Sequence, residues 1–179
     1  MLRQKVYDGG MDKKIRDELT ASMRGFRLPR FHEIPDVGLY LEQTTKYVNQ
    51  IIAPLGLGEL TGSMIRNYVK QDLLENPVKK QYSAVQIAHL IPIAILKSVA
   101  PLTAIAALFQ RQQAVYTDEV AYNYFCEEME NILYHRFGLK DTVEDIGVTS
   151  SVEKEMLRSA VTAASHVVYL NACLRGMKE

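Results

Sequence analysis

The chain has 179 residues, of which 47% are hydrophobic and 23% are charged. This length and composition favour one folded domain, or two small ones, with a substantial buried core. They exclude a disordered, a collagen-like or a disulfide-stapled chain. Lysine plus arginine and aspartate plus glutamate both total 21, so the whole chain is neutral, which by itself argues against a nucleic-acid partner.

The charge is not spread evenly along the chain. Residues 1–111 carry 15 basic and 10 acidic side chains, a net charge of +5, whereas residues 112–179 carry 6 and 11, a net charge of −5. We therefore expect two regions with different surfaces and different partners.

Cysteine usage and hydropathy indicate where the chain resides. Cys126 and Cys173 lie in apolar helical patterns and not at a metal-binding spacing, which predicts neither a metal site nor a disulfide. Prolines and polar residues interrupt the most apolar stretch, residues 88–107, so no membrane span is predicted. No apolar leader follows Met1, and we expect a cytoplasmic protein.

The first predicted elements are a surface helix and a basic arm. Residues 11–24 present a single narrow line of apolar side chains, which predicts a helix on the surface. The next stretch contains two prolines and alternates arginines with Phe26 and Phe31, which predicts an extended arm. Its residues 24–32 are suited equally to a phosphate backbone and to the protein's own surface.

A longer helix, a turn and a short helix are predicted next. Asp36 is a suitable N-cap for a helix over residues 37–54, which Pro54 ends. A second helix is predicted over residues 61–71. Residues 77–82 contain a proline and two lysines and are predicted as a loop or a small ribbon.

The rest of the chain is predicted to be helical. Ser83 caps an apolar helix that continues to Val99, and Pro92 either kinks that helix or ends its first half. Further helices are predicted over residues 101–111, 117–137 and 150–174. No stretch alternates apolar and polar residues over the length of a strand, so the predicted fold class is all-α with at most one short β-ribbon.

The last two predicted helices form an acidic hairpin. The first is rich in tyrosine and phenylalanine, and the second has small residues that let helices approach closely. We expect residues 112–179 to serve dimerisation or sensing, with a homodimer through residues 117–174 as the hypothesis for the partner. The sequence identifies no small-molecule effector.

The helix over residues 61–71 carries the clearest functional pattern. Its apolar residues are predicted to face inward, namely Met64, Ile65, Tyr68 and Val69. Ser63, Arg66, Asn67 and Lys70 recur at the spacing of a single helix face. Arginine pairs with guanine and asparagine with adenine, whereas lysine and serine hold phosphate oxygens. A solvated helix face is the plainer interpretation of the same pattern.

The neighbouring segments extend this pattern. A leucine pair ends the helix at residues 73–74, a basic segment with a proline leads to Tyr82, and Ser83 opens the next helix. In these features residues 63–90 resemble the DNA-binding domain of MerR-type regulators, which implies a winged helix-turn-helix. The resemblance implies DNA contacts from the helix, from a wing at residues 77–82 and from the end of that wing, namely Arg66, Lys70, Lys79, Lys80 and Tyr82.

A longer part of the chain is similar to a second family. The stretches concerned are LPRFHEIPDVGLYLEQ and ELTGSMIRNYVKQDLLENPVKKQYSAVQIAHLIPI. They are similar, over about 100 of the 179 residues, to a family of small Gram-positive bacterial proteins known as a domain of unknown function. This similarity implies a helical, MerR-like domain without an assigned activity.

No other pattern predicts chemistry. The glycines near residue 60 lack the spacing and the preceding strand of a phosphate-binding loop, so no cofactor is predicted. His135 and His166 are expected to be ordinary core or boundary residues, and no metal site is predicted. The acids of the helix over 117–137, Glu127, Glu128 and Glu130, are predicted to form a solvated face. We expect no catalytic activity.

These observations lead to a domain scheme and a functional hypothesis. Residues 1–35 form an N-terminal helix and arm, residues 36–111 a winged helix-turn-helix core, and residues 112–179 the hairpin. The leading hypothesis is a DNA-binding transcriptional regulator that places the helix over 61–71 in the major groove. The alternative is a non-catalytic helical interaction module with the same shape. The hypothesis for DNA requires the polar face of that helix to be exposed.

Overall fold

A computed structural model of the chain describes residues 9–147 and 150–176, and it is predominantly α-helical, as predicted. The helices are α1 (Gly9–Met23), α2 (Leu41–Ile52), α3 (Gly62–Lys70), α4 (Ala84–Leu96), α5 (Leu102–Gln113), α6 (Asp118–Arg136) and α7 (Val152–Gly176). There are also two short 3-10 turns. One, η1 (Phe31–Glu33), precedes α2 by several residues, and the other, η2 (Ala53–Leu55), directly follows it. The first eight residues of the expected N-terminal segment lie outside the described residues.

A two-stranded ribbon replaces the expected start of α2. Strand β1 (Leu39–Tyr40) pairs antiparallel with β2 (Gln81–Tyr82), so the helix begins at Leu41 and not at residue 37. Gly38 permits the approach, because a Cβ atom there would lie 2.8 Å from Cβ of Gln81. The ribbon at residues 77–82 is thus present, but its partner comes from a segment that the sequence predicts as helix.

Helix α4 is the central element of the core. Ten of its thirteen residues are buried, and it packs against α2, α5, α6 and α7. A helix that is apolar on all sides is one that neighbours surround. Pro92 lies inside α4 and does not end it, since the helix continues to Leu96. The missing hydrogen bond of the proline is tolerated because packing from all sides holds the helix together.

The two helices of the hairpin pack closely, as expected. Small and branched side chains of α7 are buried against α6, and four of them are fully or almost fully inaccessible to solvent: Leu157, Val161, Ala164 and Val168. The buried side chains of α6 and α7 join those of α2, α3 and α4 in one continuous cluster. The core therefore extends across the boundary expected near residue 111.

The acidic side chains of α6 differ from the prediction of a solvated face. Glu128 is fully buried and Glu130 is 8% exposed, whereas Glu127 is exposed. Arg158 of α7 lies 2.9 Å from Glu128, and Arg30 of the arm lies 2.8 Å from Glu130. The sequence pattern of α6 does not reveal these partners, because they come from segments far away along the chain.

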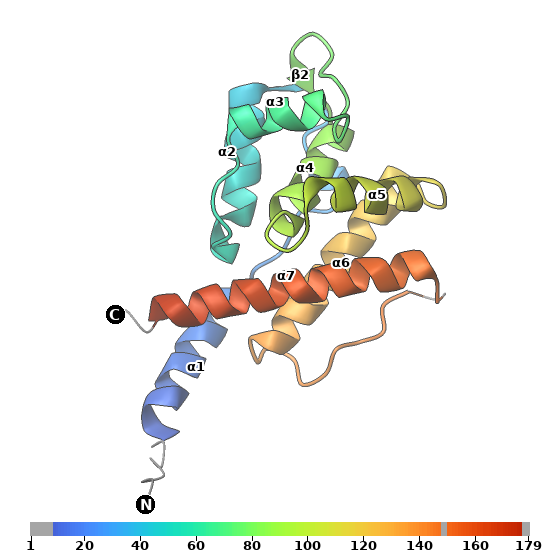
Figure 1. The fold of residues 1–179 in the computed structure, drawn as a ribbon. Helices are drawn as coiled ribbons and strands as arrows, with labels where there is room; N and C mark the ends of the chain where they lie inside the picture. The colour runs from blue at the N-terminus through green and yellow to red at the C-terminus, as the bar shows by residue number, and fades with distance from the viewer. Residues whose placement is uncertain (1–8, 148–149, 177–179) are drawn as a thin grey trace, which may run out of the picture.

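The arrangement leaves the short helix at one end of the molecule. Figure 1 shows α3 and the loop that carries β2 at one end, with α1 extending from the other end and α7 crossing in front of α6. Among the helices of the described residues, none is both long and apolar enough to cross a membrane.

Candidate nucleic-acid interface

A side-chain clamp fixes the turn between α2 and α3. The amide of Asn49 donates to the carbonyl of Leu60 at 2.8 Å and accepts from the N–H of Leu60 at 2.7 Å. Thr61 then caps α3, because its hydroxyl accepts from the N–H of Met64 at 3.2 Å. Helix α2, this turn and α3 are thus held in the order of a helix-turn-helix.

The outward face of α3 is exposed to solvent. Ser63, Arg66, Asn67 and Lys70 are all exposed, whereas Ile65 and Tyr68 are buried in the core. Met64 differs from the prediction, since it is 39% exposed and lies at the edge of the polar face. The guanidinium of Arg66 donates to the hydroxyl of Ser63 at 3.3 Å. The structure therefore brings the four predicted side chains together on one accessible surface.

The chain leaves α3 abruptly. The N–H groups of Leu73 and Leu74 both donate to the carbonyl of Tyr68, at 3.0 and 3.3 Å. Asp72 takes a left-handed conformation, with φ of 54°. The leucine pair is buried, so the polypeptide turns back into the core and α3 stays short.

The predicted basic segment is a tight turn whose two central residues are exposed lysines. Lys79 and Lys80 have φ of 51° and 65°, and the N–H of Gln81 donates to the carbonyl of Val78 at 2.9 Å. Two consecutive positive φ values between paired strands are the pattern of a type I′ turn, which usually carries asparagine and glycine. Both lysine side chains are exposed, and Figure 1 shows this loop at the same end of the molecule as α3.

The basic side chains of this surface have no acidic partner within the described residues. Arg66, Lys70, Lys79 and Lys80 form no ion pair with any residue that the structure describes. Helix α3 contains no acidic residue, and the two acids of the loop that follows, Asp72 and Glu75, are exposed. The charges of the surface are therefore available to a ligand.

Tyr82 is not part of this surface. It is 3% exposed and belongs to the core, where it anchors the ribbon. Burial raises the pKa of its hydroxyl, and the positive charge of Arg66 opposes that rise. The side chain of Tyr82 is therefore not available to a ligand at this surface.

Lys97, which the sequence did not indicate, lies beside the polar face of α3. Its ammonium group, at the end of α4, donates to the sulfur of Met64 at 3.7 Å. Burial lowers the pKa of this amine. No local pattern identifies Lys97, because only the tertiary structure places the end of α4 beside Met64.

The basic arm lies on α6. Leu28 is fully buried, and its N–H donates to Glu130 at 2.8 Å. The guanidinium of Arg30 donates to both carboxylate oxygens of Glu130, each at 2.8 Å, and this hydrogen bonding raises the pKa of Arg30. Of the two roles open to the arm, packing on the protein's own surface is the one that the structure shows for these residues.

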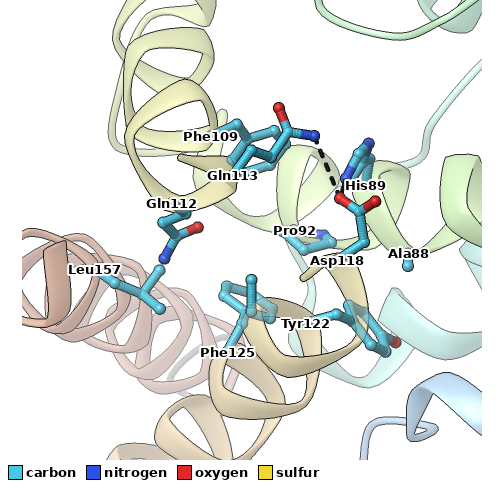
Figure 2. Close-up of a pocket in the computed structure, with 11 residues that line it drawn as sticks. Ala88, His89, Pro92, Phe109, Gln112, Gln113, Asp118, Tyr122, Phe125 and Leu157 are labelled. Atoms are coloured by element: carbon cyan, nitrogen blue, oxygen red, sulfur yellow. Dashed lines mark hydrogen bonds and ion pairs between the residues drawn. The ribbon is translucent and has the colours of Figure 1, made fainter. Parts of the chain in front are cut away.

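A small hollow lies between α4, α5 and α6. Figure 2 shows His89, Gln113 and Asp118 meeting at its edge, where Nε2 of His89 is 2.9 Å from Oδ1 of Asp118 and the amide of Gln113 donates to the same oxygen at 3.2 Å. The hollow measures about 30 Å³, which holds one water molecule and no substrate. We interpret this cluster as a link between α4 and the first turn of α6.

Nucleophilic and metal-binding groups are not assembled in the described residues. Cys126 is fully buried, and burial raises its pKa to about 12. No group of three or more metal-ligating side chains comes together within the part of the chain that the structure describes. The exposed face of α3 with the lysine turn is therefore the strongest candidate site.

The chain matches the model of a known protein family. The model of a family described as a domain of unknown function (DUF1836) matches residues 29–134. The matched range begins in the arm and ends in α6, so it contains the whole candidate surface and both members of the Arg30–Glu130 pair. The searches of curated proteins and of solved structures found no match.

Proposed function

This chain belongs to the DUF1836 family, and we propose that it is a cytoplasmic DNA-binding protein, a transcriptional regulator that places α3 in the major groove. The observation that carries the proposal is the accessible face of α3, where Ser63, Arg66, Asn67 and Lys70 lie together with no acidic neighbour on the helix. The resemblance of residues 63–90 to MerR-type regulators supports the same function.

The dimensions of α3 suit the major groove. A helix with its side chains is about 10–12 Å wide, and the major groove of B-form DNA is about 12 Å wide. Nine residues give α3 a length of about 13 Å, enough to cover a few base pairs. In this position Arg66 is suited to guanine and Asn67 to adenine, because both side chains offer two hydrogen bonds to a base edge.

The lysine turn is suited to the phosphate backbone. Lys79 and Lys80 form the turn before β2, which pairs with β1 and contacts α2, and Lys70 is the last residue of α3. Together these three lysines offer positive charges that bind phosphate groups whatever the base sequence of the DNA. Loss of one such lysine should weaken binding to all DNA sequences alike.

The proposal assigns no catalytic role and identifies no effector. Tyr82 is left out of the proposed interface because it is buried. The alternative of an interaction module that does not bind nucleic acid becomes the better interpretation if the experiment below gives no salt-dependent binding.

The test is a fluorescence-polarisation titration with DNA selected from a random-sequence pool and with unselected genomic fragments. Engagement of about three to five phosphates predicts a log–log slope of affinity against salt of roughly −3 to −5. Arg66→Ala should lower affinity for the selected DNA about 5- to 150-fold, from the loss of about 1–3 kcal/mol, and change binding to genomic fragments much less.

The matched control is Arg24→Ala, which removes an exposed arginine that directly follows α1, outside the candidate surface. It should leave both affinities unchanged. A flat salt response, or equal losses for the two arginine variants, contradicts the proposal.

A further inference from the structure

Helix α7 has a second apolar stripe, on the side that faces away from α6. Four large apolar residues on this side are strongly exposed: Val152 (58%), Met156 (38%), Leu170 (56%) and Leu174 (49%). Ala163 is also exposed and Val167 is half-buried. At about 100° per residue, all of these positions and Ser159 fall within about 80° of the helix circumference. Single exposed apolar residues are ordinary, but a continuous stripe marks an interaction surface.

The stripe is symmetric about Ala163. Val152 and Leu174 lie 11 residues before and after it, and Met156 and Leu170 lie 7 residues before and after it. The inner positions, Ser159 and Val167, repeat this relation at 4 residues. A two-fold axis through Ala163 therefore places each other member of the stripe opposite its counterpart on the second copy, as a self-complementary interface requires. The small residue at the centre lets two helices come close.

The two halves of the stripe are complementary in shape. The first half forms one wall of an apolar hollow of about 450 Å³ between α5 and α7, lined among others by Leu108, Met156 and Val152. The second half presents the exposed side chains of Leu170 and Leu174. An antiparallel pair of α7 helices places these two leucines at the hollow of the other copy, twice in each dimer.

Charge favours the antiparallel direction. The first turn of α7 carries the exposed Glu155, and its last turn carries the exposed Arg175, whose guanidinium lies over Gly56. Glu153 is not available for this contact, because it is already paired with Arg111 at 2.8 Å. Antiparallel helices bring the acidic turn of one copy beside the basic turn of the other, and their macrodipoles also oppose. A parallel pair would place like charges together at both ends.

We propose that this face of α7 binds the same face of a second copy of the chain, antiparallel, with Ala163 on the two-fold axis. Val152 then meets the partner's Leu174, and Met156 meets the partner's Leu170. This dimer is independent of DNA binding, because α7 is separate from α3 and its lysine turn (Figure 1).

The first experiment measures the molar mass of the full chain by light scattering over a dilution series. The wild type should show twice the chain mass of 20.3 kDa, falling toward one mass on dilution. Leu170→Lys should remain monomeric at concentrations where the wild type is a dimer. Val115→Lys is the control, since it changes an equally exposed valine (58%) outside the stripe and should still dimerise. Circular dichroism verifies that both variants are folded.

The second experiment fixes the direction of the pair through oxidation of engineered cysteines. Ala163→Cys should form a covalent dimer, because only a residue at the two-fold axis brings its Cα within the 4.4–6.8 Å that a disulfide needs. Ser159→Cys should not, since its two copies would lie about 12 Å apart along antiparallel helices. A monomeric wild type, a dimer that survives Leu170→Lys, or crosslinking at both positions overturns the proposal.

Discussion

The two ends of this molecule use charged side chains in opposite ways. Around α3 the basic groups of Arg66, Lys70 and Lys79 are exposed and form no ion pair with any described residue. Between the arm and α6, in contrast, Arg30 and Glu130 are largely buried and form an ion pair. The difference shows that the number of charges does not indicate a function, whereas their burial and pairing do.

The reason for the difference is the cost of desolvation. A carboxylate that leaves water needs a cation and further hydrogen bonds in compensation. Glu130 receives two bonds from Arg30 and one from the N–H of Leu28, so the arm and α6 hold each other in place. A surface that is to attract an anionic ligand needs the reverse, namely charges that remain solvated and unpaired.

The largest effect that this comparison predicts is on the buried pair. Glu130→Ala leaves the guanidinium of Arg30 and the N–H of Leu28 without their acceptor, and should lower the free energy of unfolding by about 3–5 kcal/mol. Urea denaturation measures this change. Glu127→Ala removes an exposed acid from the same helix and should change stability by about 0.5 kcal/mol or less. Similar losses in the two variants would refute the structural role of the pair.

A smaller effect is expected at the turn before α3. Asn49→Ala removes the donor and the acceptor that serve the backbone of Leu60, which is 1% exposed. We expect a loss of about 2 kcal/mol, the cost of leaving such buried groups unpaired, measured by urea denaturation. Gln50→Ala, at the exposed neighbouring position, should be close to neutral. A neutral Asn49→Ala would mean that packing alone sets the angle of α3.

One substitution in the lysine turn should raise the stability of the protein and lower its affinity for DNA. Lys80→Gly relieves a left-handed conformation that costs a side chain energy, so thermal or urea unfolding should show a gain of about 0.4–1 kcal/mol. The same change should weaken DNA binding and make the salt slope shallower by about 0.9. Lys80→Ala removes the charge and keeps the strain, so it should weaken binding without the gain in stability. A gain in both properties would separate the turn from DNA binding.

The smallest predicted effect concerns Glu128. Burial raises the pKa of this carboxyl above its ordinary value of 4.5, and Arg158 opposes the rise. The folded state therefore binds the proton more tightly than the unfolded state, and stability falls as the pH rises from 4.5 to the raised pKa. Glu128→Gln cannot titrate, so its stability relative to the wild type should increase through that pH range. A difference that is constant with pH, measured by urea denaturation, would contradict this.

Local patterns predicted much of the fold, including a short ribbon near residue 80, but not the strand that pairs with it. The start of α3 at Thr61, the start of α4 at Ser83 and the start of α6 at Thr117 were all predicted, because hydroxyl caps act within one turn of the chain. The first residues of the helix expected over 37–54 were wrong. Leu39 and Tyr40 pair with a segment more than forty residues away, and such a pairing leaves no signal in the local period.

The residues of the candidate site were predicted from their spacing, and their burial in the structure showed which of them are accessible. Ser63, Arg66, Asn67 and Lys70 lie together because a helix repeats every 3.6 residues, which the sequence alone reveals. Tyr82 was assigned to the surface by resemblance, yet the ribbon buries it. Lys97 was missed because it reaches the face only through the packing of α4.

By itself the sequence determined the all-α class, the caps and the polar face of α3, since these depend on residues within a few turns of one another. Tertiary structure alone decided which charges are free and which are neutralised. Arg24, Arg30 and Arg66 are chemically the same, and only the position of Glu130 on a distant helix makes one of them a structural residue. Ion pairing across about a hundred residues depends on how the chain folds back, and no local pattern encodes it.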